Sequence, residues 1–291
     1  MTKLREAFMS DGTAIRYSDE GEGPCIIALH GFPDTRNTWC SLSEALCSRS
    51  YRVVVPALRG YFPSSIPANG DYSLFRLAND VRELMDQLGI ERAAIIGHDW
   101  GASAAYAFSA LWPDRVLAIV TFAIPPLAVF PTGPGEWWTR PHNLYLRLGP
   151  LSAWWLRLGR MREVRRLYGL WSPSWVPPSG HIEHVINSLY QPERSRAAVD
   201  YYGSDAPPKG TPTIAKPISV PALIVYGSDE PQIRKAAFAK ALAVVGSGSR
   251  TVMFEGAGHW PHLEQSDRSF EEILAFFDLH DVRCDAQKSS G

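Results

Sequence analysis

The chain of 291 residues is long enough for one large domain or for one domain that carries an insertion. Hydrophobic residues make up 45% and charged residues 20%, as in an ordinary globular protein that is soluble in water. The net charge of −1 supplies no field that would attract nucleic acid or an anionic membrane. The longest apolar stretch, residues 116–131, is shorter than the roughly 20 residues that span a bilayer. Composition therefore predicts a protein that binds no nucleic acid and does not insert into a membrane.

Cysteine and histidine usage gives no sign of a disulfide framework or a metal site. The four cysteines contain no CxxC pair, and no histidine spacing is typical of zinc ligands. The N-terminal residues lack the apolar segment of a signal peptide. We therefore expect reduced thiols in a cytoplasmic protein that uses no metal and no cofactor.

The first part of the chain alternates short apolar runs with segments of helical periodicity. Strands are predicted at residues 25–29, 51–56, 92–96 and 116–122. Helices are predicted between them, at residues 39–47, 74–88 and 102–112. Because the strands are continuously apolar and each is followed by a helix, they indicate a mostly parallel sheet that helices cover on both faces.

The middle of the chain has a different character. Residues 125–212 hold six of the ten tryptophans, are dense in proline and arginine, and show no strand pattern. Strands then return at 222–226 and 250–254, with helices at 235–242 and 270–279. We therefore predict an α/β core built from residues 1–124 and 213–282, an inserted helical cap at 125–212, and a disordered tail at 283–291.

The strongest chemical signal is Gly97-His98-Asp99-Trp100-Gly101, which lies directly between a predicted strand and a helix rich in small residues. This is the pattern of a nucleophile elbow, Gly-x-nucleophile-x-Gly, with aspartate where serine is usual. The flanking glycines let the backbone make a sharp strand-to-helix turn. A helix N-terminus also favours a carboxylate over a neutral side chain. Asp99 is therefore the candidate nucleophile.

A second motif, His30-Gly31-Phe32-Pro33, follows the strand at 25–29. An oxyanion that forms during acyl or alkyl transfer is commonly held by two backbone N–H groups. One is expected from the residue after the nucleophile, Trp100, and the other from the loop after the early strand, at Phe32. These two residues are the candidate oxyanion hole.

The candidate base and acid lie in loops after the last two strands. Gly256-Ala257-Gly258-His259-Trp260-Pro261 places His259 in a loop, and imidazole is the natural base near neutral pH. Two acids, Asp229 and Glu230, precede it in the other loop. The chain order nucleophile, acid, histidine is that of an α/β-hydrolase triad. The usual Gly-x-x-acid-Pro spacing favours Glu230, and Asp229 is the alternative.

Four motifs together resemble those of the epoxide hydrolases of the α/β-hydrolase superfamily: His30-Gly31-Phe32-Pro33, Arg59-Gly60-Tyr61, the elbow, and Gly258-His259-Trp260. The resemblance covers nearly the whole chain and is weaker in the insertion. It implies a cap over the active-site cleft and a two-step mechanism without a cofactor. Asp99 would open the epoxide and form an alkyl ester. Water activated by His259 would then hydrolyse the ester and release a vicinal diol.

The resemblance also implies hydrogen-bond donors for the epoxide oxygen, which this family supplies from the cap, usually as two tyrosines. Val199-Asp200-Tyr201-Tyr202 resembles the family's donor segment and puts the donor at Tyr202, with Tyr201 as its neighbour. At the other position His142 stands where the first tyrosine is expected, with Tyr145 nearby. Some relatives use a histidine and a tyrosine together, so His142 and Tyr145 are both candidates.

Two other functions are compatible with the same motifs. Dehalogenases use the same Asp/His/acid set, but many carry asparagine where Phe32 stands, and those of the fluoroacetate type carry arginine where Trp100 stands. A receptor with this fold that binds a small hydrophobic ligand is the non-enzymatic alternative, although it would not need a complete triad. We expect an apolar, aromatic-tolerant small-molecule substrate and a monomer or homodimer.

Overall fold

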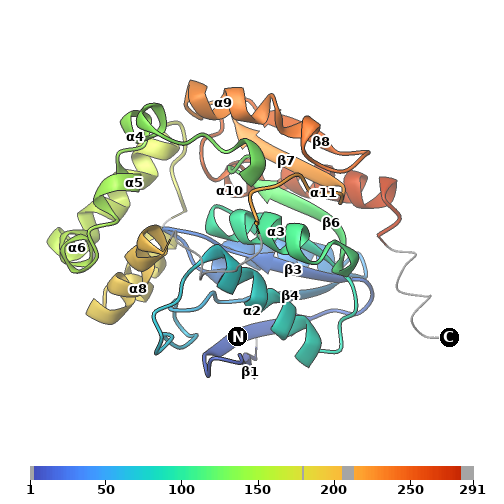
Figure 1. Ribbon diagram of the computed structural model, residues 1–291, viewed down its shortest axis with the longest axis horizontal. Helices are drawn as coiled ribbons and strands as arrows, with labels where there is room; N and C mark the ends of the chain where they lie inside the picture. Colours follow the sequence, from blue (N-terminus) through green and yellow to red (C-terminus); the bar gives the residue numbers. More distant parts are fainter. Residues whose placement is uncertain (1–2, 179, 205–212, 283–291) are drawn as a thin grey trace.

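The computed structural model describes residues 3–178, 180–204 and 213–282 (Figure 1). At its centre is one sheet of eight strands in the order β1-β2-β4-β3-β5-β6-β7-β8. The strands from β3 onward run parallel, and β1 and β2 are antiparallel. The bounds are β1 Arg5–Phe8, β2 Ala14–Glu20, β3 Cys25–Leu29, β4 Arg52–Pro56, β5 Ala93–His98, β6 Val116–Phe122, β7 Ala222–Gly227 and β8 Arg250–Phe254. The predicted mostly parallel sheet is confirmed.

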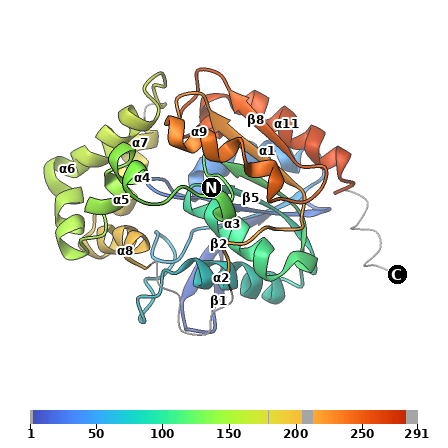
Figure 2. The same ribbon diagram turned by 45° about the horizontal axis from the view of Figure 1, so that its top comes forward.

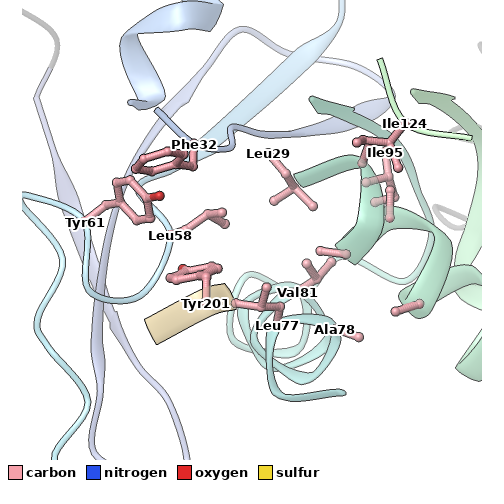
Figure 3. Close-up of a cluster of buried hydrophobic side chains, with 14 of the residues drawn as sticks. Leu29, Phe32, Leu58, Tyr61, Leu77, Ala78, Val81, Ile95, Ile124 and Tyr201 are labelled. Atoms are coloured by element: carbon pink, nitrogen blue, oxygen red, sulfur yellow. The ribbon is translucent and has the colours of Figure 1, made fainter. Parts of the chain in front are cut away.

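Helices cover both faces of the sheet, as the apolar strands predict. Helices α2 (Leu74–Gln87) and α3 (Trp100–Leu111) pack together on one face, and α1 (Cys40–Cys47) and α11 (Ser266–Leu279) pack on the other. Neighbouring strand residues alternate between the two cores, because successive side chains of a strand point to opposite faces. Ile95 lies among the side chains of the α2 and α3 face (Figure 3), and Ile96 lies in the opposite core.

Between β6 and β7 the described residues form helices and no strand. These cap helices are α4 Pro134–Thr139, α5 His142–Tyr145, α6 Pro150–Trp171, α7 His181–Leu189 and α8 Pro192–Gly203. Figures 1 and 2 show them together at one end of the sheet. They contact the loops that follow parallel strands: the Tyr168 hydroxyl donates to the carbonyl of Pro33, and the Tyr201 hydroxyl donates to that of Arg59. The cap therefore lies over the carboxyl ends of the strands, where ligands bind in α/β folds.

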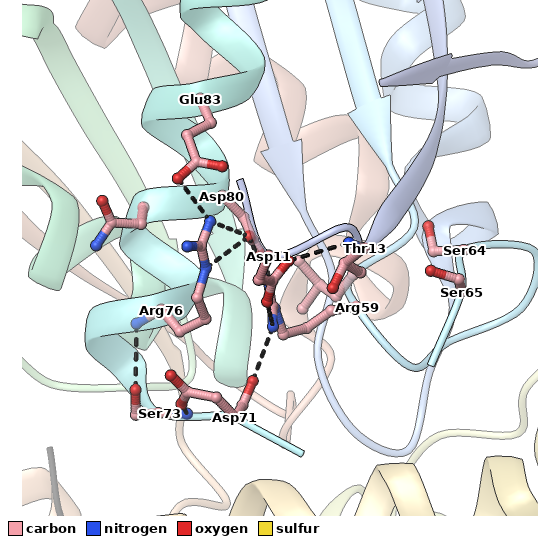
Figure 4. A network of polar contacts seen from close by, with 12 residues as sticks. Asp11, Thr13, Arg59, Ser64, Ser65, Asp71, Ser73, Arg76, Asp80 and Glu83 are labelled. Carbon is pink, nitrogen blue, oxygen red and sulfur yellow. Dashed lines mark hydrogen bonds and ion pairs between the residues drawn. The ribbon is translucent and has the colours of Figure 1, made fainter. Parts of the chain in front are cut away.

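Arg59 joins the core to the cap through a buried ionic network (Figure 4). Its guanidinium pairs bidentately with Asp80 of α2, at 2.6 Å for both bonds, and also contacts Asp11 at 2.9 Å. The Arg59 side chain is fully buried, and its carbonyl accepts the Tyr201 hydroxyl at 2.8 Å. The network therefore fixes both the loop after β4 and the cap helix α8 that rests on it.

In the part of the chain that the structure describes, no helix is both long and apolar enough to cross a membrane. Cys25, Cys40 and Cys47 are free thiols. Cys284, the predicted tail at 283–291 and residues 205–212 of the predicted cap lie outside the described residues. The remaining elements are α9 (Gln232–Phe238) and α10 (Pro261–Glu264) with short 3-10 turns between helices and strands.

Candidate active site

The elbow residue Asp99 occupies a strained backbone position between β5 and α3. Its φ of 51° and ψ of −115° lie in a region that non-glycine residues rarely adopt. The flanking glycines are required by close packing: a Cβ at Gly97 would lie 2.4 Å from the carbonyl oxygen of Gly101. A Cβ at Gly31 would lie 2.5 Å from the Cβ of Asp99. These contacts hold the nucleophile candidate directly against the loop that follows β3.

A backbone N–H group bonds to the Asp99 carboxylate, and the second candidate for the oxyanion hole is the N–H of the next residue, Trp100. The Phe32 N–H donates to Asp99 Oδ1 at 2.9 Å. Trp100 is the first residue of α3, where a backbone N–H has no partner inside the helix. Burial tends to raise the pKa of Asp99, but the neighbouring His259 and the Phe32 N–H outweigh burial and hold that pKa below its usual range. The carboxylate is therefore ionised at neutral pH, as a nucleophile must be.

His259 lies between Asp99 and Glu230. Its Nε2 is 3.5 Å from Asp99 Oδ2, and its Nδ1 is 3.3 Å from Glu230 Oε1. Burial tends to raise the pKa of Glu230, but Arg140 and His259 lower it to about 2. Asp229 is exposed, and its carboxylate approaches Ser174 Oγ at 3.4 Å. The structure thus brings Asp99, His259 and Glu230 together and leaves Asp229 at the surface.

The loop that carries His259 is held by groups that sequence patterns did not single out. The His259 N–H donates to Ser172 Oγ at 2.8 Å. The Glu264 carboxylate accepts bonds from the N–H groups on either side, at Gly258 (2.8 Å) and Trp260 (2.9 Å). Glu264 follows His259 by five positions and lies on the first turn of the short helix α10. An acid at this spacing is the sequence signal that could have predicted the hydrogen bonds to the His259 loop.

A cavity of about 480 Å³ opens beside the nucleophile, between the core and the cap. Asp99, Trp100, His142 and Tyr202 all line it. Its lining includes both apolar and charged side chains: Ile124, Leu127, Phe130 and Trp137 among the first, and Glu136, Arg140, Arg147 and Arg234 among the second. Of the six cap tryptophans, Trp137 lines this cavity and the other five do not.

Of the four candidate donors, two face this cavity and two are engaged elsewhere. The ring centroids of His142 and Tyr202 are 6.2 Å apart, and both side chains are buried. Tyr201 points away, and its hydroxyl donates to the carbonyl of Arg59. The Tyr145 hydroxyl donates to the carboxylate of Glu163 in a separate hollow of the cap.

Both cavity-facing donor candidates retain a proton at neutral pH. Burial and then the nearby negative charge of Asp99 raise the pKa of Tyr202 well above its usual value. Burial and then the charge of Arg140 lower the pKa of His142 well below its usual value, so the imidazole is neutral and carries one N–H. Each can therefore donate one hydrogen bond into the cavity.

One group of side chains has the composition of a metal site. Asp34, His98 and His262 are buried, and their potential ligand atoms lie within 4.8 Å of one another. Each makes at least one bond to its surroundings: His98 Nε2 lies 2.9 Å from the carbonyl of His259, His262 Nε2 lies 2.8 Å from Thr38 Oγ1, and Trp260 Nε1 donates to Asp34 at 3.1 Å. The Nδ1 atoms of His98 and His262 have no hydrogen-bond partner among the described residues. None of the three lines the cavity, and His98 supports the His259 loop from behind. We therefore derive no chemistry from a metal here.

Comparison with known proteins gives the same picture. A family model described as the alpha/beta hydrolase fold matches residues 24–266. An epoxide hydrolase of Caballeronia sordidicola is 28% identical over 92% of this chain and 91% of its own length. Epoxide hydrolase A of Mycobacterium tuberculosis is 27% identical over 92% and 95%. The crystal structure of epoxide hydrolase A from Mycobacterium thermoresistibile, 25% identical, superimposes with a TM-score of 0.81 over 96% of this chain and 98% of that one. The chain is a member of the α/β hydrolase fold family.

Proposed function

We propose that this protein hydrolyses an apolar epoxide to a vicinal diol, through an alkyl ester on Asp99 and without a cofactor. One observation carries the proposal: the Asp99 carboxylate and two proton-bearing cap side chains, Tyr202 and His142, line the same cavity. Opening an epoxide needs a nucleophile on carbon and a donor on oxygen at the same time. The relatives named epoxide hydrolases support this chemistry.

In the first step Asp99 Oδ2 would attack a ring carbon, because Oδ1 is already bonded to the Phe32 N–H. The carbon–oxygen bond of the ring breaks, and its electron pair becomes an alkoxide. Tyr202 donates its proton to that oxygen, and His142 donates a hydrogen bond. The product of this step is an ester whose carbonyl oxygen, Oδ1, already lies at the candidate oxyanion hole.

In the second step His259 would take a proton from water, and the resulting hydroxide attacks the ester carbonyl carbon of Asp99. The negative charge moves to Oδ1, where the N–H groups of Phe32 and Trp100 stabilise it. Glu230 stabilises the imidazolium through Nδ1, as the acid of a triad does. The intermediate collapses, the diol oxygen takes the proton from His259, and the acidic proton left on Asp99 returns to Tyr202.

A single turnover of an aryl epoxide in water enriched in heavy oxygen tests the ester directly. Because water attacks the carbonyl carbon, one heavy oxygen is expected in the Asp99 carboxylate, detected by mass analysis of its peptide. His259→Gln should stop at the ester and leave the Asp99 peptide heavier by the mass of the substrate. Heavy oxygen found only in the diol, or full turnover by Asp99→Asn, would refute the proposal.

The same assay separates the two alternatives. A dehalogenase would release halide from halogenated alkanes or acids and form no diol from an epoxide. A non-catalytic receptor would bind the epoxide and leave both the substrate and the Asp99 peptide unchanged in mass. Phe32 disfavours the dehalogenase, because its side chain has no donor to hold halide beside Trp100.

A further inference from the structure

The cap and the core each carry a Glu-x-x-x-Arg sequence, and the structure pairs the two head to tail. Glu136 of α4 forms an ion pair with Arg234 of α9, and Arg140, which follows α4, forms one with Glu230, which precedes α9. All four side chains are at most 5% exposed. We call these four residues the reciprocal clamp. It fixes one short segment of the cap against one short segment of the core.

One half of the reciprocal clamp includes the candidate triad acid. The two oxygens of Glu230 have different partners: Oε2 pairs with Arg140 Nη2, and Oε1 lies 3.3 Å from His259 Nδ1. A guanidinium from the cap and an imidazole from the core therefore share one carboxylate. The other half, Glu136 with Arg234, makes no such contact.

Arg140 also connects this carboxylate to the donor side of the cavity. His142 follows it by two residues, so a shift of Arg140 shifts the segment that holds His142 over Asp99. The Arg140 guanidinium lies 5.6 Å from the centroid of the Trp171 ring. That ring packs against both imidazoles, with centroid distances of 4.9 Å to His259 and 4.4 Å to His142.

Stability alone gives a poor explanation of the reciprocal clamp. Desolvation of buried ion pairs offsets most of their attraction, so apolar residues often serve stability equally well. Here Arg140 Nε, Arg234 Nη1 and Glu136 Oε2 are buried without a hydrogen-bond partner among the described residues, which adds to the cost. The two ion pairs instead fix a single position of the cap segment relative to the core segment.

We infer that Arg140 is a positioning residue of the proposed reaction, on which this inference rests: it orients Glu230 against His259 and ties that orientation to the position of the cap on the core. Through the shared carboxylate it also competes with the His259 imidazolium. Although Arg140 lines the cavity, its ion-pair partner is Glu230 and not Asp99, so its effect on the second step passes through Glu230.

Several charged or titratable groups face His259, and each of them could contribute to the pH dependence of ester hydrolysis. They come from the elbow, the loop before α9, the cap and α10: Asp99, His98, Glu230, His142 and His262, with Arg140 behind Glu230. Among them only Arg140 is a fixed positive charge. Its loss leaves Glu230 to stabilise the imidazolium alone.

The test compares two clamp arginines changed to the same residue. Arg140→Met and Arg234→Met each remove one guanidinium, but only the first removes a partner of Glu230. Formation and hydrolysis of the Asp99 ester are followed separately, by quenched flow and mass analysis with an aryl epoxide, from pH 5 to 9. For Arg140→Met we expect at least tenfold slower ester hydrolysis. The acid limb of that step, the range of low pH in which its rate rises with pH, should move to higher pH by about one unit. Arg234→Met should keep the limb at its wild-type position.

Arg140→Lys serves as the conservative variant, because it keeps the charge and loses the planar fork of donors. We expect its acid limb at the wild-type pH and its rate of ester hydrolysis between those of wild type and Arg140→Met. The inference would be overturned if Arg140→Met kept the acid limb at the wild-type pH and hydrolysed the ester no more slowly than Arg234→Met. Should Arg140→Met not fold, a wild-type rate in Arg140→Lys overturns it. Absence of any ester in the wild-type enzyme would instead refute the proposed function.

Discussion

Adjacent residues of α8 have different environments because helix positions one apart point about 100° from each other. Tyr201 packs against Tyr61 and Tyr72 and bonds to the loop after β4. Tyr202 turns toward Phe32 and Trp100, at centroid distances of 5.5 and 5.2 Å, and faces the cavity. A one-residue shift in the register of α8 would exchange the two roles.

Replacing Tyr202 by phenylalanine should slow formation of the Asp99 ester by about 100-fold, which is in the range that general acids contribute. The ring packing against Phe32 and Trp100 is retained, so stability should change little. Tyr145→Phe is the matched control, because the Tyr145 hydroxyl donates to Glu163 away from the cavity. Single-turnover rates of the two variants check the assignment: equal rates would contradict a donor role for Tyr202.

Local spacing explains which site residues could be predicted from sequence. Asp99, its glycines and His259 follow directly from strand ends, because the loops after parallel strands converge at one edge of the sheet. The choice of Glu230 over Asp229 rests on a single residue of spacing, and in the structure Glu230 is buried and Asp229 is exposed. Arg140 could not be predicted, since its pairing with Glu230 joins residues 90 positions apart and depends on how the cap docks.

At the scale of elements, strand periodicity predicted the parallel core well and its antiparallel edge not at all. Strands β1 and β2 bury only some of their positions and contain charged residues, so they lack the continuous apolar run that marks an interior strand. The cap helices could be predicted as a class, but not individually. Residues 158–161 interrupt α6 with non-helical backbone, although nothing in the local apolar pattern marks that break.

The Arg59 network should matter more for stability than any other ion pair on α2. Arg59→Met would remove the buried partner of Asp80 and Asp11. A buried charge that loses its partner typically costs about 3–5 kcal/mol, and the lower end is expected because Asp80 keeps Arg76 at 2.9 Å. Arg82→Met removes the exposed Arg82–Asp86 pair from the same helix, for which roughly 1 kcal/mol or less is expected. Urea denaturation at pH 7 measures both. Similar losses in the two variants would contradict a structural role for the Arg59 network.

Over the whole molecule, the chain buries an unusual number of neutral imidazoles. Desolvation lowers the pKa of His30 to about 4 and that of His98 to about 3. Burial likewise lowers the pKa of His142 and of His262 well below the usual value. These four side chains are at most 4% exposed. They come from the loop after β3, the end of β5, the cap and α10, so acid affects several parts of the site together.

Stability should therefore begin to decline once the pH falls below the ordinary pKa of histidine. In the unfolded chain each of these histidines binds a proton near pH 6.5, whereas in the folded protein His30 and His98 do so only near pH 4 and 3. As pH falls below 6.5 the unfolded state binds more protons, and each histidine removes about 1.4 kcal/mol per pH unit. Glu230, whose pKa is lowered to about 2, adds a loss of stability only below its unfolded value of about 4.5.

Urea denaturation between pH 7.5 and 5 should thus show a steep decline in the free energy of unfolding, and a flat profile would contradict the burial of neutral imidazoles. His262→Gln, which can keep a hydrogen bond to Thr38, should reduce the slope by one histidine's share.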